Sequence, residues 1–97
     1  MLTVTSTAVV VIREIAERQG LPAGAGVRIT SLPSSWNGIP ALEIKLADRP
    51  QAADEVVEAE GVRVFLDPTA SLVLDGQSLD AVVRKGKAKF VIARQAD

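Results

Sequence analysis

The hydrophobic positions near the start of the chain recur at the spacing of an α-helix. Over residues 6–19, one helical face would carry Ala8, Ile12, Ile15 and Ala16. The hydroxyl of Thr5 or Ser6 is suited to cap the first turn of this helix. Gly20 followed by Pro22 marks its end, because glycine favours helix C-termini and proline cannot continue a helix. The pattern therefore predicts one long helix close to the N-terminus.

Apolar and polar residues alternate in most of the remaining chain, which is typical of β-strands. The predicted strands cover residues 2–4, 27–30, 42–47, 56–59, 62–66, 79–83 and 88–93. In the third of these, Leu42, Ile44 and Leu46 are expected to face the core. Asp67 and Pro68 favour the start of a short helix, in which Leu72 and Leu74 are expected to pack inward. Ser31 to Pro40 is expected to form a loop between two strands.

This order of elements predicts an α+β fold. Short connections between neighbouring strands favour mostly antiparallel pairing, with the long N-terminal helix covering a sheet. A chain of 97 residues has room for one domain, residues 1–97. Its 47% hydrophobic content is enough for one modest, mainly aliphatic core.

Composition limits the chemistry that the chain can perform. The sequence contains no cysteine and no histidine. Thiolate nucleophiles, imidazole bases and the usual soft metal ligands are therefore missing. We expect no enzymatic activity, no catalytic or cofactor-binding residue, no metal ligand and no cofactor. The N-terminus has neither a signal-peptide pattern nor about 20 consecutive apolar residues, so we expect a cytoplasmic protein without a membrane partner.

Charge is distributed unevenly, although the net charge is only −1. Residues 43–60 hold six acids and two bases, and residues 84–97 hold five bases and one acid. These segments form either two solvated surfaces or complementary patches for a partner or a second copy of the chain. The basic run at residues 84–89 also suggests nucleic-acid binding. The near-neutral net charge and the scarcity of aromatic residues argue against it.

Trp36 lies in a segment rich in Ser, Pro, Asn and Gly. Such a tryptophan either folds back onto the sheet or serves as an exposed anchor for a partner. The sequence leaves both alternatives open. The candidate interaction residues are Ser34, Ser35, Trp36 and Asn37.

The segment "GVRVFLDPTASLVLDGQSLD", residues 61–80, resembles the HesB/IscA-like family of A-type iron–sulfur carriers. The similarity extends over nearly the whole chain, and it implies a HesB-like domain with mixed sheets, one long helix and one short helix. Family members hold iron or a cluster with three cysteines. One lies in the loop after the "VRI" strand and two lie in a C-terminal Cys-Gly-Cys motif. Here the loop position falls within residues 34–38, and none of the three ligands is present.

The resemblance implies a protein related to iron–sulfur cluster assembly that binds no cluster itself and acts through protein contacts. Its partners would be iron–sulfur assembly components, with a homodimer as a further possibility. One alternative is iron or cluster handling with ligands supplied by a partner or by carboxylates such as Asp54 and Glu55. Another alternative is a small nucleic-acid-binding domain.

Overall fold

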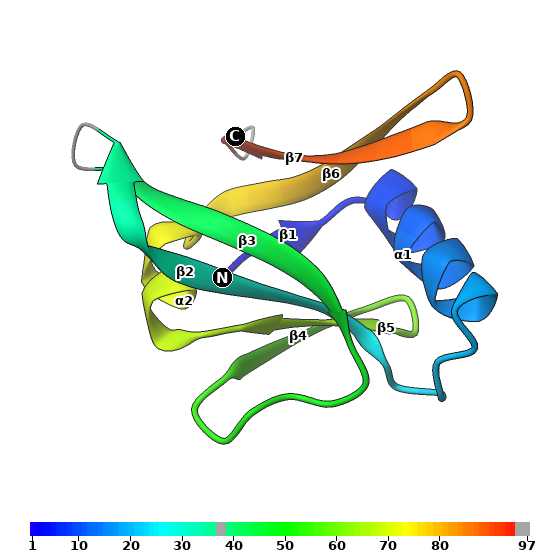
Figure 1. Ribbon diagram of the computed structural model, residues 1–97, viewed down its shortest axis with the longest axis horizontal. Coiled ribbons are helices and arrows are strands. Elements are labelled where there is room, and N and C mark those ends of the chain that lie inside the picture. Colours follow the sequence, from blue (N-terminus) through cyan, green and yellow to red (C-terminus); the bar gives the residue numbers. More distant parts are fainter. Residues whose placement is uncertain (37–38, 95–97) are drawn as a thin grey trace.

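The computed structural model describes residues 1–36 and 39–94, with the side chains of residues 33–40 outside the description. The elements follow the predicted order (Figure 1). They are β1 (Thr3–Val4), α1 (Ser6–Arg18), β2 (Gly26–Trp36), β3 (Ile39–Ala47), β4 (Glu55–Ala59), β5 (Val62–Leu66), α2 (Pro68–Val73), β6 (Gln77–Arg84) and β7 (Lys87–Arg94). Neither α1 nor α2 is long and apolar enough to cross a membrane.

The strands form two sheets, which confirms the α+β prediction. One sheet has the order β3-β2-β5-β4 and the other has the order β1-β6-β7. Pairing is antiparallel in the β2–β3, β4–β5 and β6–β7 hairpins and parallel between β1 and β6 and between β2 and β5. The sheets are therefore mixed and mostly antiparallel, as the family resemblance implies.

The main core lies between α1 and the inner faces of the two sheets. Thr5 caps α1 by accepting a hydrogen bond from the N–H of Ala8, and the buried helical residues are Ala8, Val9, Val11 and Ile12. Opposite them lie aliphatic side chains such as Ile29, Val64 and Leu79, each 0% exposed. At about 25 cal/mol per Å² of apolar surface, burial of this aliphatic core is the main favourable term in folding.

The β2–β3 hairpin corrects the prediction of a loop from Ser31 to Pro40. β2 continues to Trp36 and β3 begins at Ile39, so these two strands cover most of the expected loop. The register shifts between Ser31 and Ser35, which is the signature of a β-bulge or similar irregularity. The polar composition of this segment favours a loop, but Ser31, Ser35 and Trp36 pair with β3 through their backbones, which polar side chains do not prevent.

Two leucines were predicted wrongly as core residues. Leu72 is 81% exposed on α2, whereas Leu74, the residue that caps the end of this helix, is buried. Residues two positions apart on a helix point to nearly opposite sides, so Leu72 and Leu74 cannot both face the core. Leu46 is 37% exposed near the end of β3, which lies at the edge of its sheet among the described strands. Alternation predicts which residues share a face of a strand, but it does not predict whether another layer covers that face.

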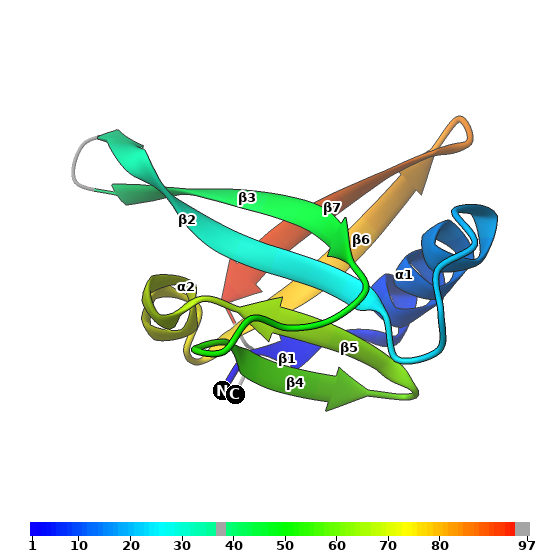
Figure 2. The ribbon, with the colours of Figure 1, turned by 60° about the horizontal axis from the view of Figure 1, so that its bottom comes forward.

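Two hairpins extend toward opposite ends of the molecule (Figures 1 and 2). The β2–β3 hairpin extends past α2, whereas the β6–β7 hairpin extends past α1. The turn between β6 and β7 is formed by Lys85 and Gly86, with φ of 51° and 76°. Positive φ at both central residues matches the right-handed twist of hairpin strands, and glycine accepts it without strain.

Candidate functional site

Three of the four sequence-predicted interaction residues lie at the end of β2. Ser34, Ser35 and Trp36 belong to the last part of β2, but their side chains lie outside the described residues. Asn37 lies outside them altogether. A contact between these four residues and a partner therefore remains a prediction. What the structure describes is the base of the β2–β3 hairpin, where two aspartates hold it to the rest of the domain.

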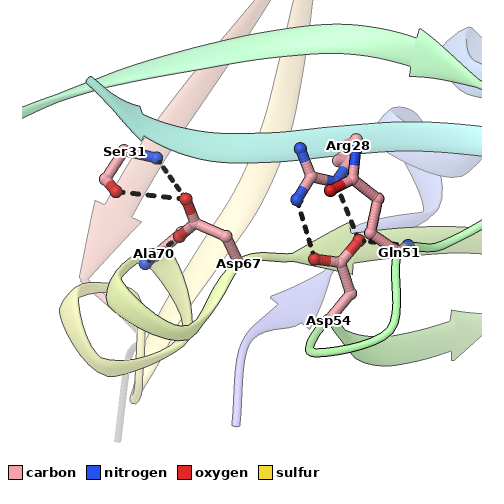
Figure 3. Close-up of polar contacts among 6 residues, drawn as sticks. All are labelled: Arg28, Ser31, Gln51, Asp54, Asp67 and Ala70. Carbon is pink, nitrogen blue, oxygen red and sulfur yellow. Dashed lines mark hydrogen bonds and ion pairs between the residues drawn. The ribbon is translucent and has the colours of Figure 1, made fainter. Parts of the chain in front are cut away.

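Asp67 joins the hairpin to α2 (Figure 3). One carboxylate oxygen accepts a hydrogen bond from the N–H of Ala70 at 2.7 Å, which caps the helix as the sequence predicted. The other oxygen accepts hydrogen bonds from the N–H of Ser31 at 2.9 Å and from its hydroxyl at 3.1 Å. Burial by itself would raise the pKa of Asp67, but the donors on Ala70 and Ser31 outweigh it and hold the pKa below the usual value.

Asp54, in the loop before β4, forms the second attachment to the β2–β3 hairpin. Its side chain is 1% exposed and forms a two-pronged ion pair with Arg28 of β2, at 2.8 Å to Nε and 2.9 Å to the terminal nitrogen. The N–H of Gln51 donates a third hydrogen bond to the same carboxylate, at 2.9 Å (Figure 3). The hydrogen bond from Arg28 is the largest reason that the pKa of Asp54 is lowered. The planar fork of arginine matches a carboxylate well, so this geometry fixes the loop before β4 against β2.

These contacts determine what the carboxylates can do chemically. Asp54 and Glu55 were the sequence-based candidates for oxygen ligands to iron. In the structure both oxygens of Asp54 are already engaged, and Glu55 is exposed on edge strand β4. Among the described residues, no group of three or more acids lies close enough together to hold a metal ion. The donor set therefore does not fit an iron–sulfur cluster, which needs thiolate ligands with occasional histidine.

Sequence reasoning missed both hairpin attachments. Arg28 and Asp54 are 26 positions apart, and Ser31 and Asp67 are 36 positions apart. No local pattern relates residues at such separations. The helix-capping role of Asp67 was predictable, because it depends only on Pro68 and the residues that follow. Its bonds to Ser31 depend on how β2 and β5 pair.

Comparison with known proteins places the chain in a family. No protein-family model matches it. It is 33% identical over 92 residues to an uncharacterised protein from the nifU 5′ region of Cereibacter sphaeroides, covering 94% of this chain and 84% of that protein. It is 30% identical over 91 residues to the mitochondrial iron–sulfur assembly protein IscA-like 3 of Arabidopsis thaliana, covering 94% and 80% of the two chains. The chain belongs to the IscA-like family of iron–sulfur assembly proteins.

Solved structures agree with this assignment. Escherichia coli SufA, which is involved in the biosynthesis of iron–sulfur clusters, superposes with a TM-score of 0.79 at 26% identity, covering 96% of this chain and 79% of SufA. The crystal structure of IscA with a [2Fe-2S] cluster has a TM-score of 0.76 at 21% identity, covering 97% and 85% of the two chains. The second likeness supports the fold alone. This IscA-like chain thus keeps the family architecture without any cysteine or histidine.

Proposed function

We propose that this IscA-like protein takes part in iron–sulfur cluster assembly without holding a cluster, and that it acts through contacts with other proteins rather than as an enzyme. The involvement in assembly is inferred from its relatives in Arabidopsis thaliana and Escherichia coli. The absence of cluster binding is inferred from the chemistry of the chain itself.

The observation that carries the proposal is the complete lack of sulfur and imidazole ligands. The only sulfur atom belongs to Met1, as a thioether, and no cysteine or histidine occurs anywhere in the sequence. Thiolates hold the iron atoms of clusters because they are soft, anionic donors. Serine hydroxyls, such as those of Ser34 and Ser35, stay protonated at neutral pH and are poor substitutes.

The carboxylates of Asp54 and Asp67 are poorly placed to replace the missing thiolate and imidazole ligands. To bind iron, Asp54 would have to give up its ion pair with Arg28, and Asp67 would have to give up the hydrogen bonds that hold α2 to β2. Breaking a buried, hydrogen-bonded charge pair typically costs about 3–5 kcal/mol. Iron binding by these groups would therefore compete directly with the stability of the fold.

Anaerobic reconstitution with ferrous iron and sulfide tests the proposal. IscA, whose solved structure contains a [2Fe-2S] cluster, is treated in parallel as the control for the procedure. After gel filtration, we expect visible absorbance and stoichiometric iron and sulfide with IscA and none with this protein. A brown product carrying stoichiometric iron and sulfide on the chain alone would refute the proposal. Should iron bind, the Asp54→Asn variant would show whether that carboxylate holds it.

Mixing experiments distinguish the alternative in which a partner supplies the ligands. A cluster that is stable only in a complex of this protein with a second assembly protein would support shared ligation. A complex that forms equally well with and without iron would support a role based on protein contacts.

A further inference from the structure

The positive charges of this protein fall into two groups that differ in their contacts. Each of the six cationic side chains before residue 84 has a partner within the fold. Arg18, Arg28, Lys45 and Arg49 form ion pairs with Glu14, Asp54, Glu43 and Asp48. Arg13 and Arg63 donate hydrogen bonds to the backbone carbonyls of Glu60 and Gly24.

The second group lies on the β6–β7 hairpin. Its members are Arg84, Lys85, Lys87, Lys89 and Arg94. Within the part of the chain that the structure describes, none of these five forms an ion pair or a side-chain hydrogen bond. The two groups therefore differ in their contacts: each of the six earlier cations has a partner, whereas the five on the projecting hairpin have no such contact with any described residue.

Strand pairing gathers three of these cations on one face of the hairpin. Arg84 lies opposite Lys87, and Val82 lies opposite Lys89, so all four side chains point to the same side. Together with Ala88 and Val91, they line a shallow hollow of about 370 Å³. The other side of the hairpin, near Val83, faces α1. We call the side formed by Val82, Arg84, Lys87, Lys89 and Val91 the basic face.

Charge and backbone together indicate what the basic face would bind. The acid of β6, Asp80, lies further along this side, where it accepts a hydrogen bond from Thr5 at 2.7 Å and forms no ion pair with these cations among the described residues. Val82 is 40% exposed, which leaves apolar surface between the charges. β7 is also an edge strand among the described strands, so one side of its backbone has no neighbouring strand. Lysines on an edge repel another basic strand and attract an acidic one.

We propose that the β6–β7 hairpin binds an extended acidic segment of a partner protein, which pairs with β7 and places its carboxylates against the basic face. This mode of recognition combines backbone hydrogen bonds along a sheet edge with side-chain selectivity at alternate positions. It depends on the proposed function only in requiring that the protein acts through protein contacts. The reconstitution experiment and the peptide experiment below can therefore fail independently.

A protein segment explains the basic face better than a nucleic acid does. Binding of single-stranded nucleic acids relies on exposed aromatic side chains on which the bases stack. Among the aromatic side chains that the structure describes, Phe65 is fully buried and Phe90 packs against the core. The valines of the basic face offer apolar contacts to side chains rather than stacking surfaces for bases.

Peptide titration tests this proposal. The probe is a peptide of alternating Glu and Val, blocked at both ends and as long as β7, with 8 residues. A matched peptide carries Gln in place of every Glu. We expect the Glu-Val peptide to bind with an affinity that falls as salt rises, to slow amide hydrogen exchange along β7, and to bind at least about tenfold more tightly than the Gln-Val peptide.

Two charge-reversal variants locate the binding site. Lys87→Glu combined with Lys89→Glu should weaken binding of the Glu-Val peptide by about tenfold or more. The control variant, Lys45→Glu combined with Arg49→Glu, changes the net charge equally but lies at the end of β3 and in the loop after it. It should bind within about twofold of the unmodified protein, and circular dichroism should show that both variants are folded.

Four results would overturn the proposal. One is the absence of peptide binding, and another is equal loss of binding in both variants, which would indicate a general charge effect. Tighter binding of an oligothymidine than of the peptide would identify a phosphate-binding surface instead. Self-association that disappears in the Lys87→Glu/Lys89→Glu variant, without peptide binding, would make a second copy of the chain the occupant.

Discussion

The carboxylate of Asp67 accepts two hydrogen bonds from Ser31, one from its backbone N–H at 2.9 Å and one from its hydroxyl at 3.1 Å. The same side chain caps α2 through the N–H of Ala70. The N–H of Asp67 in turn donates to the carbonyl of Ile29 at 3.2 Å. One residue therefore fixes the start of α2 and contacts β2 at the point where the pairing of β2 with β5 ends.

Replacing Asp67 should destabilise the protein much more than replacing an ordinary helix cap. Asp67→Ala removes the cap, worth about 1 kcal/mol, and leaves the N–H of Ser31 without its acceptor, at a further cost of about 1–3 kcal/mol. We expect the free energy of unfolding in urea to fall by about 2–4 kcal/mol. Ser31→Ala removes only the hydroxyl and should cost about 1 kcal/mol. An equal decrease in the free energy of unfolding of the Asp67→Ala and Ser31→Ala variants would contradict the view that Asp67 contributes more than its bond to the Ser31 hydroxyl.

The ion pair between Arg28 and Asp54 should show measurable coupling. A double-mutant cycle with Arg28→Ala and Asp54→Ala isolates the interaction from the separate effects of the two truncations. Because Asp54 is 1% exposed and Arg28 is 20% exposed, the pair is shielded from water and we expect a coupling free energy of about 1–3 kcal/mol. The exposed pair Lys45–Glu43 is the control and should give less than about 1 kcal/mol. Similar values for both pairs would mean that burial contributes nothing.

The same two aspartates should make stability depend on acidic pH. The pKa values of Asp54 and Asp67 are lowered from 3.8 in the fold, so the unfolded chain binds protons more readily than the folded protein. Their stabilisation is therefore fully present well above pH 3.8 and is lost as the pH falls through the lower pKa values of the folded state. Urea unfolding between about pH 6 and pH 2 should show this fall. The double variant Asp54→Asn/Asp67→Asn should be less stable near neutral pH, and its free energy of unfolding should change less with pH. An unchanged pH dependence of the free energy of unfolding would show that these two aspartates do not cause the fall in stability.

Gly26 should not tolerate a larger residue, because a Cβ atom at this position would clash with the neighbouring strand. A Cβ atom at this position would lie 1.7 Å from the backbone oxygen of Arg63, where β2 and β5 run in parallel. Gly26→Ala must therefore separate the two strands, and we expect it to cost more than about 3 kcal/mol or to prevent folding. Gly20 has nothing within 4 Å of its Cβ position and a φ of +68°. Gly20→Ala should cost only about 1–2 kcal/mol, and comparable thermal unfolding of both variants would disprove the steric explanation.

The order of helices and strands was determined locally, and it could be predicted from the sequence. Three of these features each depend on a few consecutive residues: the cap by Thr5, the proline at the start of α2, and the turn between β4 and β5, where Glu60 and Gly61 have positive φ. The absence of cysteine and histidine likewise limits the chemistry of the chain in any conformation. The helix cap, the proline and the turn depend on interactions between residues that are close together in the sequence.

The tertiary structure decided the features that depend on residues brought together from distant parts of the chain. Pairing of β2 with β5 places Ser31 beside Asp67, and the path of the loop before β4 brings Asp54 to Arg28. The sequence also did not show that Leu72 is exposed, nor which cations have a partner among the described residues. The sequence gives the chemical type of each side chain. The neighbours of a side chain, and hence its role, are fixed only when the sheets assemble and pack.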